Sequence, residues 1–142
     1  MFETLLAGVT LGIHLASVHV PAQAWQNNVN IGVYARNADG WTAGVYRNTL
    51  RRTSVYAGYT FEHGPLALTV GAITGYQKKG VTCNDPMSTG CTLGSSRGYV
   101  SLMAAPSVTL PEFAGLVPRV SFIPGIGSPS SSVFHLSMER KF

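Results

Sequence analysis

The feature that most constrains the fold is a two-residue alternation of apolar with polar or small side chains, repeated in segments of roughly 8 to 12 residues. Turn-forming residues separate the segments, as at 37–40 and 62–65. The pattern predicts strands near 8–20, 29–37, 40–48, 53–62, 65–76, 97–105, 117–124 and 132–142. Short turns alternate with longer connections at 21–28, 77–96 and 125–131, and only the link at 106–116 is longer than this rule predicts. We therefore expect residues 1–142 to form one all-β domain, an eight-stranded antiparallel up-and-down β-barrel.

Each predicted strand has one apolar face and one polar or small face. In the second strand, Val29, Ile31 and Val33 alternate with Asn30 and Gly32. Only 11% of the residues are charged, whereas the surface of a soluble domain carries about 25–35%. We therefore expect the apolar face to contact lipid in an outer membrane and the polar face to line the lumen. The alternative is a soluble calyx whose apolar face points inward and binds a small apolar ligand.

Four charged residues fall on the polar face near the rim where the short turns lie. Buried charges are rarely left unpaired, because an isolated buried charge costs several kcal/mol. The alternation therefore predicts an ion-pair cluster that plugs the lumen, formed by Arg36, Glu62, Arg119 and Glu139.

The net charge of +4 suggests an anionic partner. Six of the ten Lys and Arg residues lie in or beside two of the predicted loops: Arg47, Arg51, Arg52, Lys78, Lys79 and Arg97. A dense basic stripe with stacking aromatic residues, which is typical of nucleic-acid modules, is missing from the sequence. We therefore expect an anionic partner that is not nucleic acid.

Cys83 and Cys91 lie in a turn-rich segment between Gly80 and Gly94. A disulfide that closes this loop would suit an oxidising compartment, and two free thiols are the alternative. No His lies nearby to complete a zinc site, so we expect no metal and no other cofactor.

The first 24 residues partly resemble a secretory signal. Residues 5–18 are apolar and 22–24 resemble a cleavage site, but Glu3 stands where a positive charge is usual and His14 interrupts the apolar segment. We expect residues 8–20 to be the first strand and not a cleaved signal. A cytoplasmic or virion-associated location is therefore the alternative to the outer membrane.

Several short segments, in the same order and spacing, resemble the lipid A palmitoyltransferases. They are GIHLASV at 12–18, WTAGVYRNT at 41–49, AGYTFE at 57–62, APSVTLP at 105–111, SFIPG at 121–125 and the terminal Phe142. The resemblance covers nearly the whole chain. It implies an outer-membrane barrel that moves a fatty acyl chain from a phospholipid to a lipid A-like acceptor and holds that chain in its lumen.

The resemblance also implies a catalytic site. His14, Asn48 and Thr49 stand at the positions of the family's essential His, Asp and Ser, so they are expected to converge at the long-loop rim. Asn48 is not a carboxylate and cannot act as a charged partner of the His. An active acyltransferase and a degenerate descendant of one both remain open.

Further positions are expected to contact the substrate. Thr60 replaces a glycine that lets the acyl chain reach the lumen floor in the family, so chain length should differ from palmitate. Prolines interrupt strand ladders, and the family's proline gaps act as lateral gates, although such prolines can also simply end strands. The expected contacts are Tyr46, Arg51, Arg52, Thr60, Pro106 and Pro124.

A second function from a different class is compatible with the same residues. A phage-encoded relative of the family would be a non-catalytic barrel with a structural or host-envelope interaction role. Acyl transfer from a labelled phospholipid distinguishes the two. The sequence does not specify the oligomeric state, the acyl chain or the acceptor.

Overall fold

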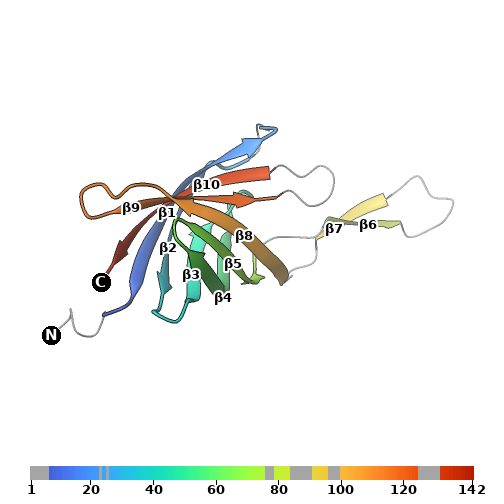
Figure 1. Cartoon of the computed structure of the whole chain (residues 1–142). Helices are drawn as coiled ribbons and strands as arrows, with labels where there is room; N and C mark the ends of the chain where they lie inside the picture. Colours follow the sequence, from blue (N-terminus) through green and yellow to red (C-terminus); the bar gives the residue numbers. More distant parts are fainter. Residues whose placement is uncertain are drawn as a thin grey trace.

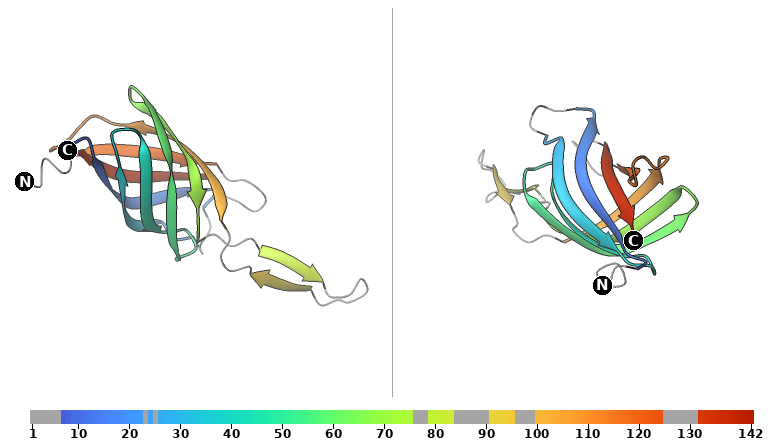
Figure 2. Two further views of the ribbon diagram at one scale, coloured as in Figure 1. Left: turned by 90° about the horizontal axis from the view of Figure 1, so that it is seen from below. Right: turned by 90° about the vertical axis from the view of Figure 1, so that its left-hand side faces the viewer.

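The computed structural model of the protein describes residues 7–22, 24, 26–75, 79–83, 91–95, 100–124 and 132–142. Eight antiparallel strands form one closed barrel, shown in Figure 1 and from two further directions in Figure 2. They are β1 (Thr10–Val20), β2 (Val29–Arg36), β3 (Trp41–Arg47), β4 (Thr53–His63), β5 (Leu66–Ile73), β8 (Ser101–Thr109), β9 (Val117–Ile123) and β10 (Ser132–Lys141). The last strand pairs with the first from Thr10–Lys141 to Val20–Ser132, which closes the barrel. The predicted fold class is confirmed.

Two predicted boundaries differ from the structure. The connection predicted at 77–96 contains a two-stranded sheet of its own, β6 (Lys79–Cys83) and β7 (Cys91–Ser95). The strand predicted at 97–105 begins four residues later, at Ser101, and extends to Thr109. The proline at 106 therefore lies inside a strand and does not end one. None of the described residues belongs to a helix long and apolar enough to cross a membrane.

Pro106 is tolerated inside β8 because its backbone nitrogen, which carries no hydrogen, faces β9. The ladder between β8 and β9 does not extend to this residue. The Thr109 N–H donates to Pro65 O beside β5, and the Leu110 N–H donates to Pro118 O on β9. Because successive residues of a strand face opposite neighbours, Pro106 faces β9. The β8–β9 ladder contains only the pairs of 107–109 with 119–121. The gap predicted at this proline is therefore present.

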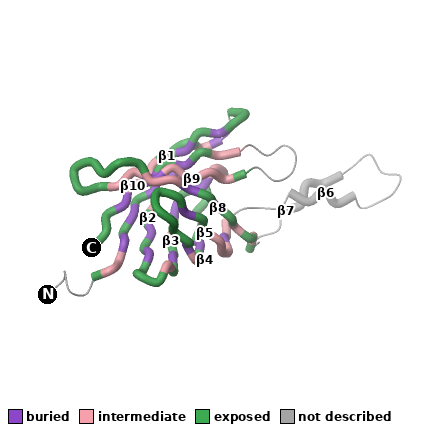
Figure 3. Tube along the Cα trace, in the orientation of Figure 1, coloured by how far each residue is buried: buried purple, intermediate pink, exposed green. Residues whose placement is uncertain are grey.

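The apolar faces point outward and the polar faces point inward. Val29, Ile31 and Val33 are 61%, 61% and 56% exposed, whereas Asn30 and Arg36 are 2% and 7% exposed. Buried and exposed residues alternate along the barrel strands in Figure 3. The face assignment from the sequence is therefore correct. The soluble calyx required the opposite arrangement, with apolar rows inside, and the barrel does not have it.

Aromatic side chains fill the middle of the lumen. Tyr34, Tyr46 and Tyr56 form a buried cluster with Ile73. Glycines on adjacent strands leave room for these rings. A Cβ at Gly12 would collide with the Tyr34 ring, so the small residues of the inward rows are matched to the tyrosines they face.

A β-bulge in β1 sets which of its residues face the lumen. The register with both β2 and β10 shifts by one residue between His14 and Ala16. Relative to β10 the extra residue is Leu15 on β1, whereas relative to β2 the extra residue lies on β2. The inward positions of β1 change from even to odd numbers at this point. His14 is buried before the bulge, and Ser17 and His19 are buried after it.

Candidate functional site at the long-loop rim

Three polar side chains form a hydrogen-bonded series where β1 ends at the long-loop rim. His19 Nδ1 lies 2.6 Å from Asn28 Oδ1, and His19 Nε2 lies 2.9 Å from Thr49 Oγ1. An amide oxygen only accepts hydrogen bonds, so Nδ1 carries the ring proton and Nε2 accepts from the Thr49 hydroxyl. The imidazole is 3% exposed. A hydroxyl, an imidazole and an orienting amide are thus held in the order that activates a nucleophile.

Backbone contacts fix the two loops that supply this series. The Asn27 N–H donates to Thr49 O over 3.0 Å, and the Asn27 side-chain amide donates to Asn48 O over 3.2 Å. The loop before β2 and the turn after β3 are therefore joined at the rim. The join places Asn28 and Thr49 on either side of the ring of His19.

Asn48 has a structural role in this arrangement. Its Oδ1 accepts from the N–H groups of Leu50 and Arg52 at 2.9 and 3.0 Å, and its Nδ2 donates to Ser54 Oγ and Gly75 O, both at 2.9 Å. The residue is 0% exposed. Its amide thus shapes the turn that carries Thr49 and does not orient a histidine.

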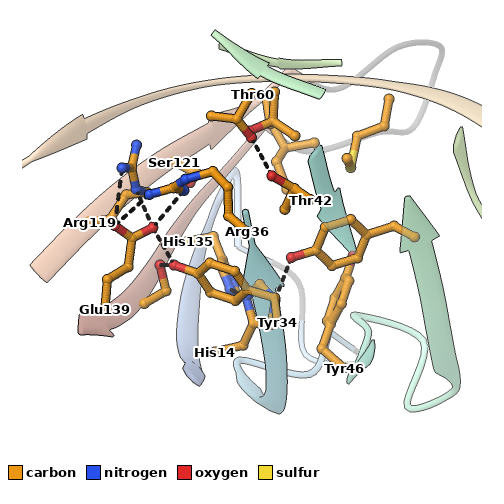
Figure 4. Close-up of a pocket in the computed structure, with 16 residues that line it drawn as sticks. His14, Tyr34, Arg36, Thr42, Tyr46, Thr60, Arg119, Ser121, His135 and Glu139 are labelled. Carbon is orange, nitrogen blue, oxygen red and sulfur yellow. Dashed lines mark hydrogen bonds and ion pairs between the residues drawn. The ribbon is translucent and has the colours of Figure 1, made fainter. Parts of the chain in front are cut away.

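His14 does not join Asn48 and Thr49, so the prediction that the three converge is wrong. Figure 4 shows its ring among the lumen tyrosines. His14 Nδ1 lies 2.7 Å from His135 Nε2, and its Nε2 lies 3.0 Å from Tyr56 Oη. The physical reason is position along β1: His14 precedes the bulge, whereas His19 follows it and reaches the rim.

The four charged residues predicted from alternation do meet inside the barrel. Glu139 pairs with Arg36 at 3.1 Å and with Arg119 at 2.7 Å, and Glu62 pairs with the same arginines at 3.0 and 2.9 Å. The Glu62 side chain is 48% exposed, while the other three are 5–8% exposed. Figure 4 shows Arg36, Arg119 and Glu139 of this cluster side by side.

A small cavity remains between this ion cluster and the tyrosines. Its volume is about 70 Å³, and Met103, Ala105 and Ile123 border it beside the β8–β9 gap. Thr60 borders it within a hydroxyl series, 2.8 Å from Thr42 and 2.9 Å from Thr69. Small-molecule sites typically have volumes of about 300–1,000 Å³, so this cavity is far smaller than a palmitoyl chain requires. The expectation that the acyl chain lies in the lumen gains no support from this cavity and stays a prediction.

The other predicted contact residues are dispersed. Tyr46 is buried in the lumen, Arg51 and Arg52 are exposed in the turn beside Thr49, and Pro106 and Pro124 are exposed at the β8–β9 gap. Their roles towards a substrate stay predictions. Arg51 has a φ of 59°, a left-handed conformation that shapes this tight turn.

Cys83 and Cys91 are Cα partners in the β6–β7 ladder. Directly opposite residues of antiparallel strands lie about 4.5–5.5 Å apart between Cα atoms, which overlaps the range that a disulfide spans. Within the described part of the chain, no three His, Cys, Asp or Glu side chains gather as metal ligands.

His19 and Asn28 were not predicted from the sequence, although they complete the site. Counting alternate residues from His14 places His19 on the lipid face, and only the bulge at Leu15 reverses this. The available signal is that His19 is followed at once by Val20 and Pro21. Proline favours the end of a strand, so this histidine had to lie at a rim.

Comparisons with family models, with curated proteins and with solved structures give no significant match. The resemblance to the lipid A palmitoyltransferases therefore stays a prediction from short sequence segments.

Proposed function

We propose that the chain is an outer-membrane barrel that transfers an acyl group from a phospholipid to a lipid A-like acceptor at its long-loop rim. The observation that carries this proposal is the Asn28–His19–Thr49 series, with hydrogen bonds of 2.6 and 2.9 Å. A hydroxyl that shares its proton with a buried, oriented imidazole is suited to attack an ester carbonyl near neutral pH.

In the proposed reaction, Thr49 Oγ1 attacks the carbonyl carbon of the phospholipid ester while its proton passes to His19 Nε2. The tetrahedral intermediate then expels the lysophospholipid oxygen, which takes that proton, and an acyl ester remains on Thr49. A hydroxyl of the acceptor next gives its proton to His19 Nε2 and attacks this ester. The expelled Thr49 Oγ1 takes that proton from His19, which restores the Thr49 hydroxyl and the acceptor of the next proton. Throughout, Asn28 Oδ1 holds the Nδ1–H of the ring and so keeps Nε2 directed at the reacting oxygen.

The barrel exterior supports a membrane location for this chemistry. Large apolar side chains are exposed on every barrel strand except β9, including Ile13, Val33, Val55, Leu68 and Phe134. An outward apolar band with a polar interior is the arrangement of barrels that span outer membranes. The long-loop rim then lies at the membrane surface, where ester groups of lipids are found.

Charge at the rim supports an anionic substrate. Arg51 and Arg52 follow Thr49 in the same turn, and both are exposed. Among the described residues, neither forms an ion pair with a carboxylate. Two free guanidinium groups beside the proposed nucleophile can bind phosphate groups of the donor or the acceptor.

The test is acyl transfer from a radiolabelled phospholipid to a lipid A acceptor by the chain reconstituted in vesicles. We expect Thr49→Val and His19→Ala each to lower the transfer rate at least about a hundredfold, because a general base typically contributes 10²–10⁴. Thr109→Val, which removes a hydroxyl at the opposite rim, should leave the rate unchanged. Equal rates for all four proteins would show that the series is not catalytic.

A non-catalytic barrel is the second candidate. It is favoured by the amide of Asn28, which stabilises an imidazolium less than a carboxylate does, and by the filled lumen. This candidate predicts that the wild-type chain transfers no acyl group in the same vesicles. It also predicts that His19→Ala lowers only the unfolding free energy.

A further inference from the structure

An open groove of about 500 Å³ lies on β1, β2 and β3, in a barrel whose lumen cavity is only about 70 Å³. Four exposed apolar side chains from three strands line it, namely Ile13, Ile31, Val33 and Val45. The half-buried Leu15 and the lumen residues His14 and Tyr46 also border it. The bulge residue Leu15 and the side-chain-free Gly32 both border the groove. Its volume is within the range of about 300–1,000 Å³ that is typical of small-molecule sites.

One end of the groove is basic. Arg47 and Thr53, which are Cα partners on β3 and β4, also line it and are exposed. Arg47 forms no ion pair with the carboxylates of the described residues. The groove thus combines an apolar floor with one free guanidinium at the long-loop end, which is complementary to a molecule with a hydrocarbon tail and an anionic head.

The basic end lies next to the proposed reaction centre. Thr49 follows Arg47 by two residues, and Asn28 precedes β2, whose residue Ile31 lines the groove. The Asn27–Thr49 backbone hydrogen bond joins the two segments at this point. A head group held by Arg47 would therefore lie close to the Thr49 hydroxyl.

We propose that this groove binds one anionic diacyl phospholipid from the bilayer, with an acyl tail along Ile13, Ile31 and Val33 and its phosphate on Arg47. The inference rests on the proposed function for the identity of the lipid as acyl donor. It places the donor's tail outside the barrel. The tail then needs no passage through the barrel wall, and the packed lumen is no obstacle to transfer.

Photo-crosslinking tests the groove directly. The chain is reconstituted in phosphatidylcholine vesicles that contain a small fraction of phosphatidylglycerol with a diazirine in its tail, and labelled residues are mapped by peptide mass. We expect most of the label on the groove residues of β1–β3. Arg47→Ala should lower this label about fivefold, the loss that follows from one exposed charge–charge contact. Arg140→Ala, an exposed arginine at the opposite rim, should leave it unchanged.

Two variants separate this inference from the proposed function. Thr49→Val should keep the groove label while it abolishes transfer. Label in the groove without transfer by the wild-type chain would refute the acyltransferase and leave the lipid site standing. Label spread evenly over the exterior of all eight barrel strands, with no effect of Arg47→Ala, would refute the groove. Label inside the lumen that increases in Thr60→Gly would also refute it.

Discussion

Asn28 is the residue that most sharply distinguishes catalysis from a structural role at the rim. Its Oδ1 lies 2.6 Å from His19 Nδ1, where a carboxylate would stabilise the imidazolium formed during proton transfer. We predict that Asn28→Asp raises the initial rate of acyl transfer at least about tenfold. The matched control is Asn37→Asp at the opposite rim, because Asn37 Oδ1 accepts from the backbone N–H groups of Asp39 and Trp41 and a carboxylate oxygen can do the same. A rate unchanged or lowered by Asn28→Asp would contradict the proposed role of the amide.

Arg36 tests the ion cluster at the same scale. Its side chain is 8% exposed and pairs with Glu139 and Glu62. We predict that Arg36→Ala lowers the unfolding free energy by about 3–5 kcal/mol, because Glu139 would lose one of its two buried partners. Urea unfolding in lipid vesicles measures this, with Arg140→Ala expected within about 0.5 kcal/mol of wild type. A similarly small change for Arg36→Ala would mean that water solvates this end of the lumen.

The four charged residues of this cluster show what alternation alone can predict. They come from four different strands, and each was placed on the inward face by counting alternate residues. The count succeeds because three ladders have no register shift: β2 with β3, β4 with β5, and β9 with β10. Period-two reasoning is reliable wherever the ladder is regular.

At the scale of elements, β1 shows why the histidine beside Thr49 was not predicted. The bulge inserts Leu15 relative to β10 although no turn-forming residue adjoins it in the sequence. Each residue after the bulge exchanges faces relative to the simple count. The family resemblance indicates His14, and the simple count gives no sign that His19 faces inward beside Thr49.

The β8 boundary differs from the prediction for another reason. Proline normally ends a strand, so the sequence favoured an end at 105. The strand continues through Pro106 because the residue faces the side where the β8–β9 ladder is absent. Whether a proline disrupts a strand depends on whether the neighbouring strand pairs with it at that position. This pairing belongs to the tertiary structure and cannot be predicted from the local sequence.

The β6–β7 hairpin carries the remaining element-scale prediction. Cys83 and Cys91 are opposite each other in its ladder, so little backbone movement is needed for a disulfide. We predict that protein recovered from an oxidising compartment has the mass expected after loss of two hydrogens. Reduction should add the two hydrogens back and make both thiols alkylatable. Two alkylatable thiols before reduction would contradict the prediction.

At the scale of the whole molecule, the apolar exterior should respond to charge as a lipid-facing surface does. Val55 points outward from β4 and is 55% exposed. We predict that Val55→Lys lowers the unfolding free energy in bilayers by about 1–2 kcal/mol, because a lysine costs about 2–4 kcal/mol at the membrane midplane and up to about 1 near the interfaces, and Val55 lies two residues from the long-loop end of β4. Val55→Thr is the control of similar shape and should cost clearly less. A change below about 0.5 kcal/mol for the lysine would be typical of a water-exposed surface instead.

The central claim is that outward apolar rows insert this barrel into a membrane. Flotation of the refolded chain with phospholipid vesicles on a density gradient tests it most directly. We predict that the folded chain rises with the vesicles, stays with them after an alkaline wash and aggregates when it is refolded without lipid or detergent. A folded, monodisperse chain that remains at the bottom of the gradient, and that also folds in lipid-free buffer, would contradict the claim.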